Sequence, residues 1–436
     1  MKKLFQYINN EVLVKAANLN LANLSLRIIA GILVSKFIAI YIGPQGMALI
    51  GNLRNFMSAL QSLSISGLYK GVVRLISQFK EDAVQLTKTL STVFYFGFFS
   101  SVLLSFLCYY NAEFINDLIF SANYRYTYII KTLAVVLPFY ALNMFAFSIM
   151  NGFSKHKYLL IINILGQILG LLVALLLIYQ ENIDGALQAI VITPALNLLI
   201  TIVGIAFRRS LVSSIKITQV SFSIINKLCP YMIMALVSTI ALPIVMIIIR
   251  NYLIDEVGIK AAGYWTAMTR VSDYYLMFFN SLMALYILPR FSEINSKQAF
   301  RKEVFGFYKT IIPSFLMILL LIYLSRSVLI NLLFTEDFRP VEDLFGFQIL
   351  GDIARVLSMV IAYQFLAKKM FTHFLILEIF LFIMMYFSSI YLIDEFGLQG
   401  AVMGHCLSYF MYFGIIILLF NSSLFGLLDE DKTEEL

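Results

Sequence analysis

The feature that most constrains this chain is a series of about twelve long apolar segments that follow one another along most of its length. A helix needs about 20 mainly apolar residues to cross the hydrocarbon core of a bilayer, and each segment reaches roughly that length. We therefore predict an all-α, polytopic membrane protein. The predicted spans are residues 16–42, 46–73, 88–110, 128–151, 158–179, 185–206, 223–250, 260–289, 306–330, 344–367, 371–393 and 398–421.

The composition excludes the common soluble classes. The chain of 436 residues is 61% hydrophobic and 13% charged, whereas a soluble domain carries about 25% charged residues. The net charge of +7 does not predict nucleic-acid binding, because the basic residues are scattered and form no basic face with interleaved aromatics. Cys108, Cys229 and Cys406 show no metal-ligand spacing, and we expect no metal and no cofactor.

The basic residues favour one side of the membrane. On one side, the loops and span ends hold only Arg125, Arg250, Lys260, Arg326 and Arg339. The alternating loops hold most of the other lysines and arginines. By the positive-inside rule, we expect both termini in the cytoplasm and the protein in a bacterial inner membrane. Within this topology, Arg250 and Arg290 lie at predicted span ends and are expected to be ordinary interfacial anchors or to ring a cavity mouth.

The two halves of the sequence echo one another. Arg54 and Arg270 are 216 residues apart (270 − 54), and Arg74 and Arg290 have the same separation (290 − 74). The segment IDGALQA around Gly185 resembles LQGAVMG around Gly400, 215 residues later (400 − 185). Such repeats are common in transporters. We predict two six-helix bundles around a central cavity, formed by an N-terminal lobe of residues 1–215 and a C-terminal lobe of residues 216–436 that ends in an acidic cytoplasmic tail.

Ionisable residues inside the predicted spans are the strongest functional signal. Each costs about 2.5–3.5 kcal/mol to insert at the centre of a helix, and such residues usually mark functional sites. Several form polar stripes at helical spacing. The stripes are Asn20, Asn23 and Arg27 on the first span; Arg54, Ser58, Gln61 and Ser62 on the second, beside Asn52 and Asn55; Gly263, Thr266, Arg270, Asp273 and Ser281 on the eighth; and Gln348, Asp352 and Arg355 on the tenth.

These stripes have two interpretations. Arg270 with Asp273, and Arg355 with Asp352, are spaced to neutralise each other within a helix and could only join helices. Alternatively, the stripes line a cationic, water-filled cavity for an anion, because the planar guanidinium fork can donate two hydrogen bonds to phosphate oxygens. In this second interpretation the substrate-binding candidates are Arg27, Arg54, Arg270, Arg355, Asn23, Asn55 and Gln61.

Three carboxylates, Asp273, Asp352 and Glu378, are candidates for coupling transport to H⁺ or Na⁺. Glu378 has no basic residue one helical turn away, and an unpaired carboxylate in a low dielectric tends to take up a proton. A structural acid bonded to another helix is the alternative for Glu378. We expect His373 and His405 to be packing histidines whose hydrogen bonds are satisfied.

Enzyme signatures are absent from the sequence. It contains no phosphate-binding loop of the G-x-x-x-x-G-K-[ST] type, no HExxH and no G-x-S-x-G elbow. Its predicted loops are too short to form an external domain. The sequence therefore predicts a transporter and not an enzyme, and a membrane glycan polymerase is a weaker alternative.

Several segments carry a resemblance to a known family. GPQGMALIGNLRNF (43–56), VSDYYL (271–276), LPRFSEI (288–294), DLFGFQILGDIARV (343–356) and FLAKKMFTHFLILEIF (365–380) resemble the Wzx-type flippases for lipid-linked glycans, in particular those for the enterobacterial common antigen. These flippases belong to the multidrug/oligosaccharidyl-lipid/polysaccharide exporter superfamily. The resemblance covers nearly the whole chain and is most specific in the tenth and eleventh spans.

The resemblance implies transfer of an undecaprenyl-diphosphate-linked oligosaccharide to the periplasmic leaflet by alternating access. It implies roles for Arg27, Arg54, Asp273, Asp352, Arg355 and Glu378, which match positions that are polar or charged in the family. Arg270 and the acidic tail, residues 429–436, depart from the family pattern. Membrane lipid is an implied partner, as are a polysaccharide polymerase and a chain-length regulator in O-antigen and lipopolysaccharide biosynthesis. A cation-coupled multidrug exporter is the alternative, although such a cavity is typically acidic and aromatic.

Overall fold

The computed structural model describes residues 11–79, 81–120, 124–205, 215–368 and 370–425. Helices and short connections account for this part of the chain, and no strand occurs in it. The prediction of an all-α protein is confirmed. The acidic tail, residues 429–436, lies outside the described residues.

The chain divides into two compact units. One comprises Met1–Ile42 and Leu49–Ile247, and the other comprises Gly43–Ala48 and Ile248–Leu436. We refer to them as the N-unit and the C-unit and describe each by itself.

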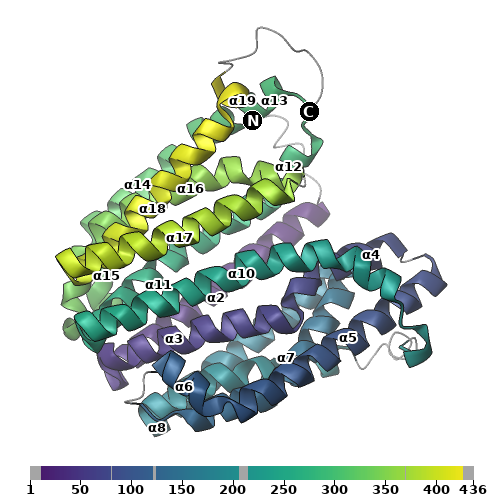
Figure 1. Cartoon of the computed structure of the whole chain (residues 1–436), viewed down its shortest axis with the longest axis horizontal. Coiled ribbons are helices and arrows are strands. Elements are labelled where there is room, and N and C mark those ends of the chain that lie inside the picture. The colour runs from purple at the N-terminus through teal and green to yellow at the C-terminus, as the bar shows by residue number, and fades with distance from the viewer. Residues whose placement is uncertain (1–10, 80, 121–123, 206–214, 369, 426–436) are drawn as a thin grey trace. The chain divides into compact units, whose positions relative to one another are not determined.

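The N-unit is built from long apolar helices (Figure 1). Within it, α7 packs against α4, α5 and α8, and α2 packs against α8. One buried apolar cluster in this unit contains Val72, Leu90, Phe145 and Ile149. The elements are α2 (Glu11–Tyr41), α3 (Gly43–Gln61) from Leu49 onward, the π-helical turn η1 (Ser62–Ser66), α4 (Gly67–Phe79), α5 (Ala83–Tyr110), α6 (Ala112–Phe120), α7 (Thr127–Gly152), α8 (His156–Ile205), η2 (Ile217–Gln219) and α10 (Phe222–Glu256) as far as Ile247.

The C-unit repeats this style of packing. Its central helices are α11, α16, α17 and α18, of which α18 contacts the other three. The elements are α11 (Ile259–Leu282), the π-helical turn η3 (Met283–Ile287), α12 (Leu288–Glu293), α13 (Lys297–Thr310), α14 (Ile312–Leu324), α15 (Arg326–Leu333), η4 (Glu336–Leu344), α16 (Phe345–Ala367), α17 (Phe371–Phe396), α18 (Leu398–Leu419) and α19 (Asn421–Phe425).

In the described part of the chain, the twelve predicted spans all overlie helices. Nine helical stretches in the described residues are long and apolar enough to cross a membrane. One of them, Lys157–Val203, covers two predicted spans, because α8 changes direction at Asn182, where φ is 50° and ψ is −118°. The two remaining predictions, 46–73 and 223–250, fall on α3 to α4 and on α10.

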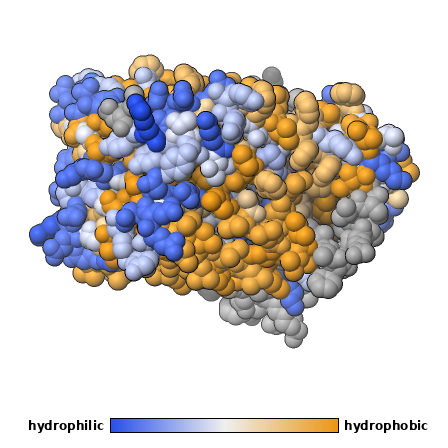
Figure 2. All heavy atoms as spheres, turned by 90° about the horizontal axis from the view of Figure 1, so that it is seen from below, coloured by the Kyte–Doolittle hydropathy of each residue, from blue (hydrophilic) through white to orange (hydrophobic). Residues whose placement is uncertain are grey.

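The surface of each unit fits a lipid environment. Large apolar side chains are exposed, such as Phe99 (70%) and Leu172 (60%) in the N-unit and Leu324 (68%) and Phe387 (63%) in the C-unit. Figure 2 shows apolar residues over much of the visible surface. Soluble monomers rarely expose this much apolar area. Together with the nine long apolar helical stretches of the described residues, it shows that the protein is a multi-pass membrane protein.

The backbone supports the predicted duplication. Gly43 and Gly258, 215 residues apart (258 − 43), both have positive φ at the start of a helix. Asn182 and Gly397, also 215 apart (397 − 182), share a second unusual conformation. A Cβ added to Gly185 would lie 1.9 Å from the Leu177 carbonyl oxygen, and one on Gly400 would lie 2.0 Å from that of Leu392. Both halves therefore use the same tight helical hairpin, and only glycine fits where its arms meet.

Candidate functional site

The most complete polar site in the C-unit surrounds Asp352, whose side chain is fully buried on α16. Its Oδ2 accepts hydrogen bonds from Ser272 Oγ at 2.6 Å, Tyr275 OH at 2.5 Å and Gln348 Nε2 at 3.2 Å. Its Oδ1 lies 3.1 Å from His405 Nε2. A buried carboxylate is stable only when it is paired and hydrogen-bonded, and Asp352 meets that condition with donors from α11, α16 and α18.

Helical spacing explains most of this cluster. Gln348 and Asp352 are four residues apart on α16, and Ser272 and Tyr275 are three apart on α11, so each pair shares a helix face. The close approach of α18 depends on Gly351, since a Cβ there would lie 2.5 Å from His405 Cδ2. His405 therefore reaches Asp352 because the preceding residue on α16 is a glycine.

The neighbours of His405 indicate which tautomer it adopts. An ionised carboxylate only accepts hydrogen bonds, so we assign the proton of His405 to Nε2, from which it donates to Asp352 Oδ1. The Gln348 amide nitrogen also lies 3.2 Å from His405 Nε2, and with this assignment it donates to Asp352 instead. His405 is thus a buried histidine with a hydrogen-bond partner, as expected, and that partner is the buried acid.

Arg355 and Glu378 extend the site along α18. The Arg355 guanidinium lies 5.4 Å from the centre of the Tyr409 ring, and its Nε has no hydrogen-bond partner in the described part of the chain. Glu378 Oε1 accepts a hydrogen bond from Tyr412 OH at 3.4 Å. Tyr409 and Tyr412 themselves meet edge to face, with ring centres 6.5 Å apart.

The sequence analysis missed this face of α18. His405, Tyr409 and Tyr412 are spaced at i, i+4 and i+7, which places them on one side of the helix. This spacing was the sequence signal that could have identified the face. Its residues contact Asp352, Arg355 and Glu378, which the sequence analysis had identified separately. Asp273 is exposed on α11 next to Ser272, and its charge acts on Arg355.

Two buried arginines form a second cluster in the C-unit. Arg250 is 2% exposed and Arg270 is 7% exposed, and the two are close enough for their charges to interact. Arg250 Nε donates to Thr266 Oγ1 at 2.9 Å, and its guanidinium lies 5.2 Å from the centre of the Trp265 ring. The expectation that Arg250 is an ordinary interfacial anchor is wrong, because its side chain is buried and bonded to Thr266 of α11. The alternative, that it rings a cavity mouth, stays a prediction.

The N-unit holds the other predicted substrate-binding residues on α2 and α3. Asn23 Oδ1 accepts a hydrogen bond from Gln167 Nε2 at 2.9 Å, which joins α2 to α8. Arg27, one turn later on α2, is exposed. Asn55 Nδ2 is buried without a hydrogen-bond partner among the described residues. Gln61 lines a cavity of about 380 Å³ together with Ser58, Ser62, Tyr140, Thr239, Leu242 and Pro243.

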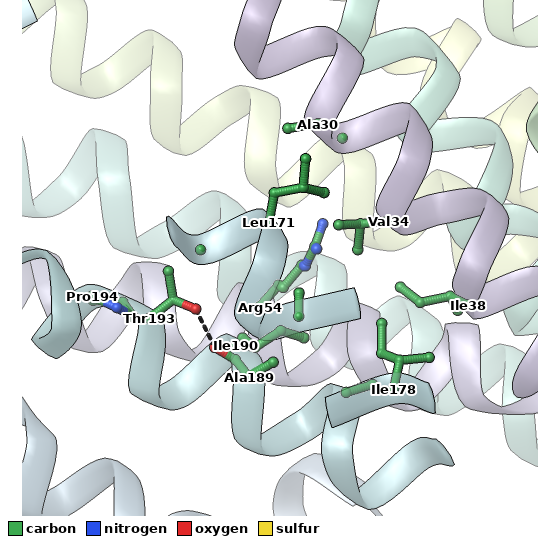
Figure 3. Close-up of a pocket in the computed structure, with 14 residues that line it drawn as sticks. Ala30, Val34, Ile38, Arg54, Leu171, Ile178, Ala189, Ile190, Thr193 and Pro194 are labelled. Carbon is green, nitrogen blue, oxygen red and sulfur yellow. Dashed lines mark hydrogen bonds between the residues drawn. The ribbon is translucent and has the colours of Figure 1, made fainter. Parts of the chain in front are cut away.

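Arg54, next to Asn55 on α3, lines a different cavity. It is exposed on α3 and lines a cavity of about 300 Å³ between α2, α3 and α8. Figure 3 shows its side chain rising between Val34 of α2 and Leu171 of α8. Arg27 is not among the described residues that line this cavity, so the structure does not join the two arginines in one pocket of the N-unit.

Residues 39–343 match the family described as "Polysaccharide biosynthesis protein". The chain belongs to this family. Among curated relatives of this family member, the Lipid III flippases of Escherichia coli (strain K12) and Shigella flexneri are each 26% identical to it over 405 residues, which cover 92% of this chain and 97% of theirs.

Solved structures show the same fold. An inward-facing multidrug resistance MATE family transporter of the MOP superfamily superposes with a TM-score of 0.74 at 16% identity, over 94% of this chain and 96% of that one. The Lipid II flippase MurJ in an inward closed conformation superposes with a TM-score of 0.69 at 17% identity, over 94% and 87%. This member of the polysaccharide biosynthesis family therefore has the fold of polytopic transporters.

Proposed function

We propose that this protein is a flippase that moves an undecaprenyl-diphosphate-linked oligosaccharide from the cytoplasmic to the periplasmic leaflet of a bacterial inner membrane. The observation that carries the proposal is the identity of 26% with Lipid III flippases over 92% of the chain. It comes with arginines within the apolar helices, such as Arg54 on α3 and Arg270 on α11. A guanidinium binds a diphosphate through paired hydrogen bonds, so arginines in the membrane suit this head group.

In the proposed mechanism, the lobes of residues 1–215 and 216–436 alternate in opening to the two sides of the membrane. Arg27, Arg54, Arg270 and Arg355 line a cationic path for the diphosphate, and Asn23, Asn55 and Gln61 supply neutral hydrogen-bonding groups. The polyprenyl chain stays in lipid, where it is soluble. Both termini are cytoplasmic in this proposal, and a polymerase with its chain-length regulator uses the delivered product.

The Asp352 site is the proposed place of ion coupling. Asp352 has donors from four side chains, whereas Glu378 accepts one hydrogen bond in the described residues, from Tyr412. A carboxylate with few donors loses least when it gains and releases a proton. We therefore assign proton exchange to Glu378. The α18 stripe of His405, Tyr409 and Tyr412 carries the change in charge to Arg355 and Asp352, with Asp273 beside them.

Reconstitution tests the proposed function. Full-length protein is placed in proteoliposomes with an undecaprenyl-diphosphate-linked oligosaccharide, and an impermeant glycosidase is added outside. Without protein, only the outer-leaflet pool is cleaved. With protein, the inner pool should also become accessible. In cells, loss of the gene should make a lipid-linked sugar accumulate on the cytoplasmic leaflet. An unchanged inner pool, together with export of a cationic dye by the same vesicles, would favour the drug exporter instead.

A further inference from the structure

The cavity beside Arg54 has a chemistry that the flipping mechanism alone does not explain. It lies between α2, α3 and both halves of α8, and Ala30, Val34, Leu171 and Ile190 are among the residues that line it (Figure 3). All of these residues belong to the N-unit. The cavity therefore lies entirely within the N-unit.

Small side chains on neighbouring turns leave this space open. Gly31 on α2, and Ala174, Ala186 and Ala189 on α8, all line it. The part of α8 before the Asn182 kink and the part after it both contribute small residues. The hollow is therefore specified by the sequence at several positions.

The lining combines an apolar wall with one cation. Arg54 is the charged residue among the described lining residues, and no carboxylate lines the cavity there. The hydroxyl of Thr193 is already used, since it donates to the Ala189 carbonyl oxygen at 2.6 Å. A neutral apolar guest would gain nothing from Arg54, and a free inorganic anion would gain nothing from the apolar wall. The lining suits a ligand in which an apolar chain is attached directly to a phosphate.

The size of the cavity further limits which ligands it can hold. A volume of about 300 Å³ lies at the lower end of the ~300–1,000 Å³ usual for small-molecule pockets. It has room for a short stretch of branched hydrocarbon and is too small for an oligosaccharide. Isoprenyl diphosphates have this form, because their first isoprene unit is bonded to the diphosphate.

We propose that this cavity binds the isoprene units nearest the diphosphate of the carrier lipid, while Arg54 binds the diphosphate itself. This inference rests on the proposed function and deepens it, since it assigns a place to one defined part of the substrate. The recognised element is the junction of chain and diphosphate, which every glycan on the same carrier shares. The remainder of the polyprenyl chain extends into lipid.

Binding by the purified full-length chain tests the inference. The ligands are farnesyl diphosphate and inorganic diphosphate, and the variants are Ala174→Phe, which fills the cavity, and Leu172→Phe, which adds the same ring where α8 is 60% exposed. Wild-type protein should bind farnesyl diphosphate at least about tenfold more tightly than inorganic diphosphate, in line with burial of a few apolar groups. Ala174→Phe should abolish that margin without changing the affinity for inorganic diphosphate, and Leu172→Phe should keep it.

Partition of farnesyl diphosphate into detergent affects all variants alike and cancels in the comparison. If Ala174→Phe unfolds, the smaller filling variant Ala186→Leu replaces it. Wild-type affinity of folded filling variants for farnesyl diphosphate would overturn the cavity assignment and leave the flippase proposal intact. Equal displacement of farnesyl diphosphate by short-chain phosphatidic acid would also overturn it, in favour of an ordinary phospholipid. If the wild-type chain binds neither diphosphate, the proposed function itself fails.

Discussion

His405 Nε2 and Asp352 Oδ1 lie 3.1 Å apart, which ties α18 to α16 inside the C-unit. With the proton assigned to Nε2, His405 is the donor. Loss of this donor leaves a buried carboxylate with one partner fewer. Because a hydrogen bond to a charged group contributes about 1.5–3 kcal/mol, His405→Ala should lower the free energy of unfolding by about that amount. This loss of stability is measured as a decrease in the thermal midpoint of the purified variant relative to wild type.

Two further variants serve as controls for His405. His405→Gln keeps a donor near Asp352 and should recover part of the loss. Leu407→Ala on the same helix, where the side chain is 43% exposed, should change the midpoint little. A His405→Ala protein as stable as wild type would show that the bond is not important for the C-unit.

Two glycines of α16 make a matched pair. A Cβ on Gly351 would lie 2.5 Å from His405 Cδ2 and 2.9 Å from the backbone Cα of Cys406, whereas one on Gly346 would meet nothing within 4 Å. Gly351→Ala should therefore force α16 and α18 apart and reduce both folded yield and transport. Gly346→Ala should be neutral or stabilise the helix by about 0.5–1 kcal/mol. Equal thermal midpoints for Gly351→Ala and Gly346→Ala would contradict this packing of α16 against α18.

Glu378→Gln tests the coupling proposal. The amide keeps a hydrogen-bond partner for Tyr412 but cannot exchange a proton, so gradient-driven flipping should be lost while substrate binding is retained. Flipping is measured in proteoliposomes with and without an imposed pH gradient, and Asp352→Asn is measured beside it. Gradient-driven flipping by Glu378→Gln at the wild-type rate would make Glu378 a structural acid and leave Asp273 and Asp352 as the candidates.

The kink of α8 offers a test of the duplication. Asn182 has φ 50° and ψ −118°, a conformation that its counterpart Gly397 adopts without a side chain. Strain of this kind costs about 1–3 kcal/mol at a non-glycine residue. Asn182→Gly should therefore raise the thermal midpoint, and Gly397→Ala should lower it. A lower midpoint for Asn182→Gly would indicate that its side chain makes contacts that outweigh the strain.

The sequence was sufficient for the helices and for half of the Asp352 site. Apolar length located the spans, and helical spacing placed Gln348, Asp352 and Arg355 on one face of α16. It did not join His405 to Asp352, because that contact depends on how closely α18 approaches Gly351. Nor did it show that Arg250 is buried, because its contacts with Thr266 and Trp265 come from α11. Contacts between helices need the rotation of each helix about its axis, which a single sequence does not specify.

The central claim is that arginines in the membrane hold the diphosphate of a lipid-linked glycan, and Arg54 tests it most directly. The measurement is the binding and flipping of an undecaprenyl-diphosphate-linked oligosaccharide by reconstituted Arg54→Ala, Arg54→Lys and Arg27→Ala, with Arg74→Ala, an exposed arginine on α4, as the control. Loss of one charged hydrogen-bonding group should weaken binding by about 10- to 150-fold. Lysine should restore only part of it, since it keeps the charge but not the fork. Wild-type binding and flipping by Arg54→Ala and Arg27→Ala at normal expression would contradict the account.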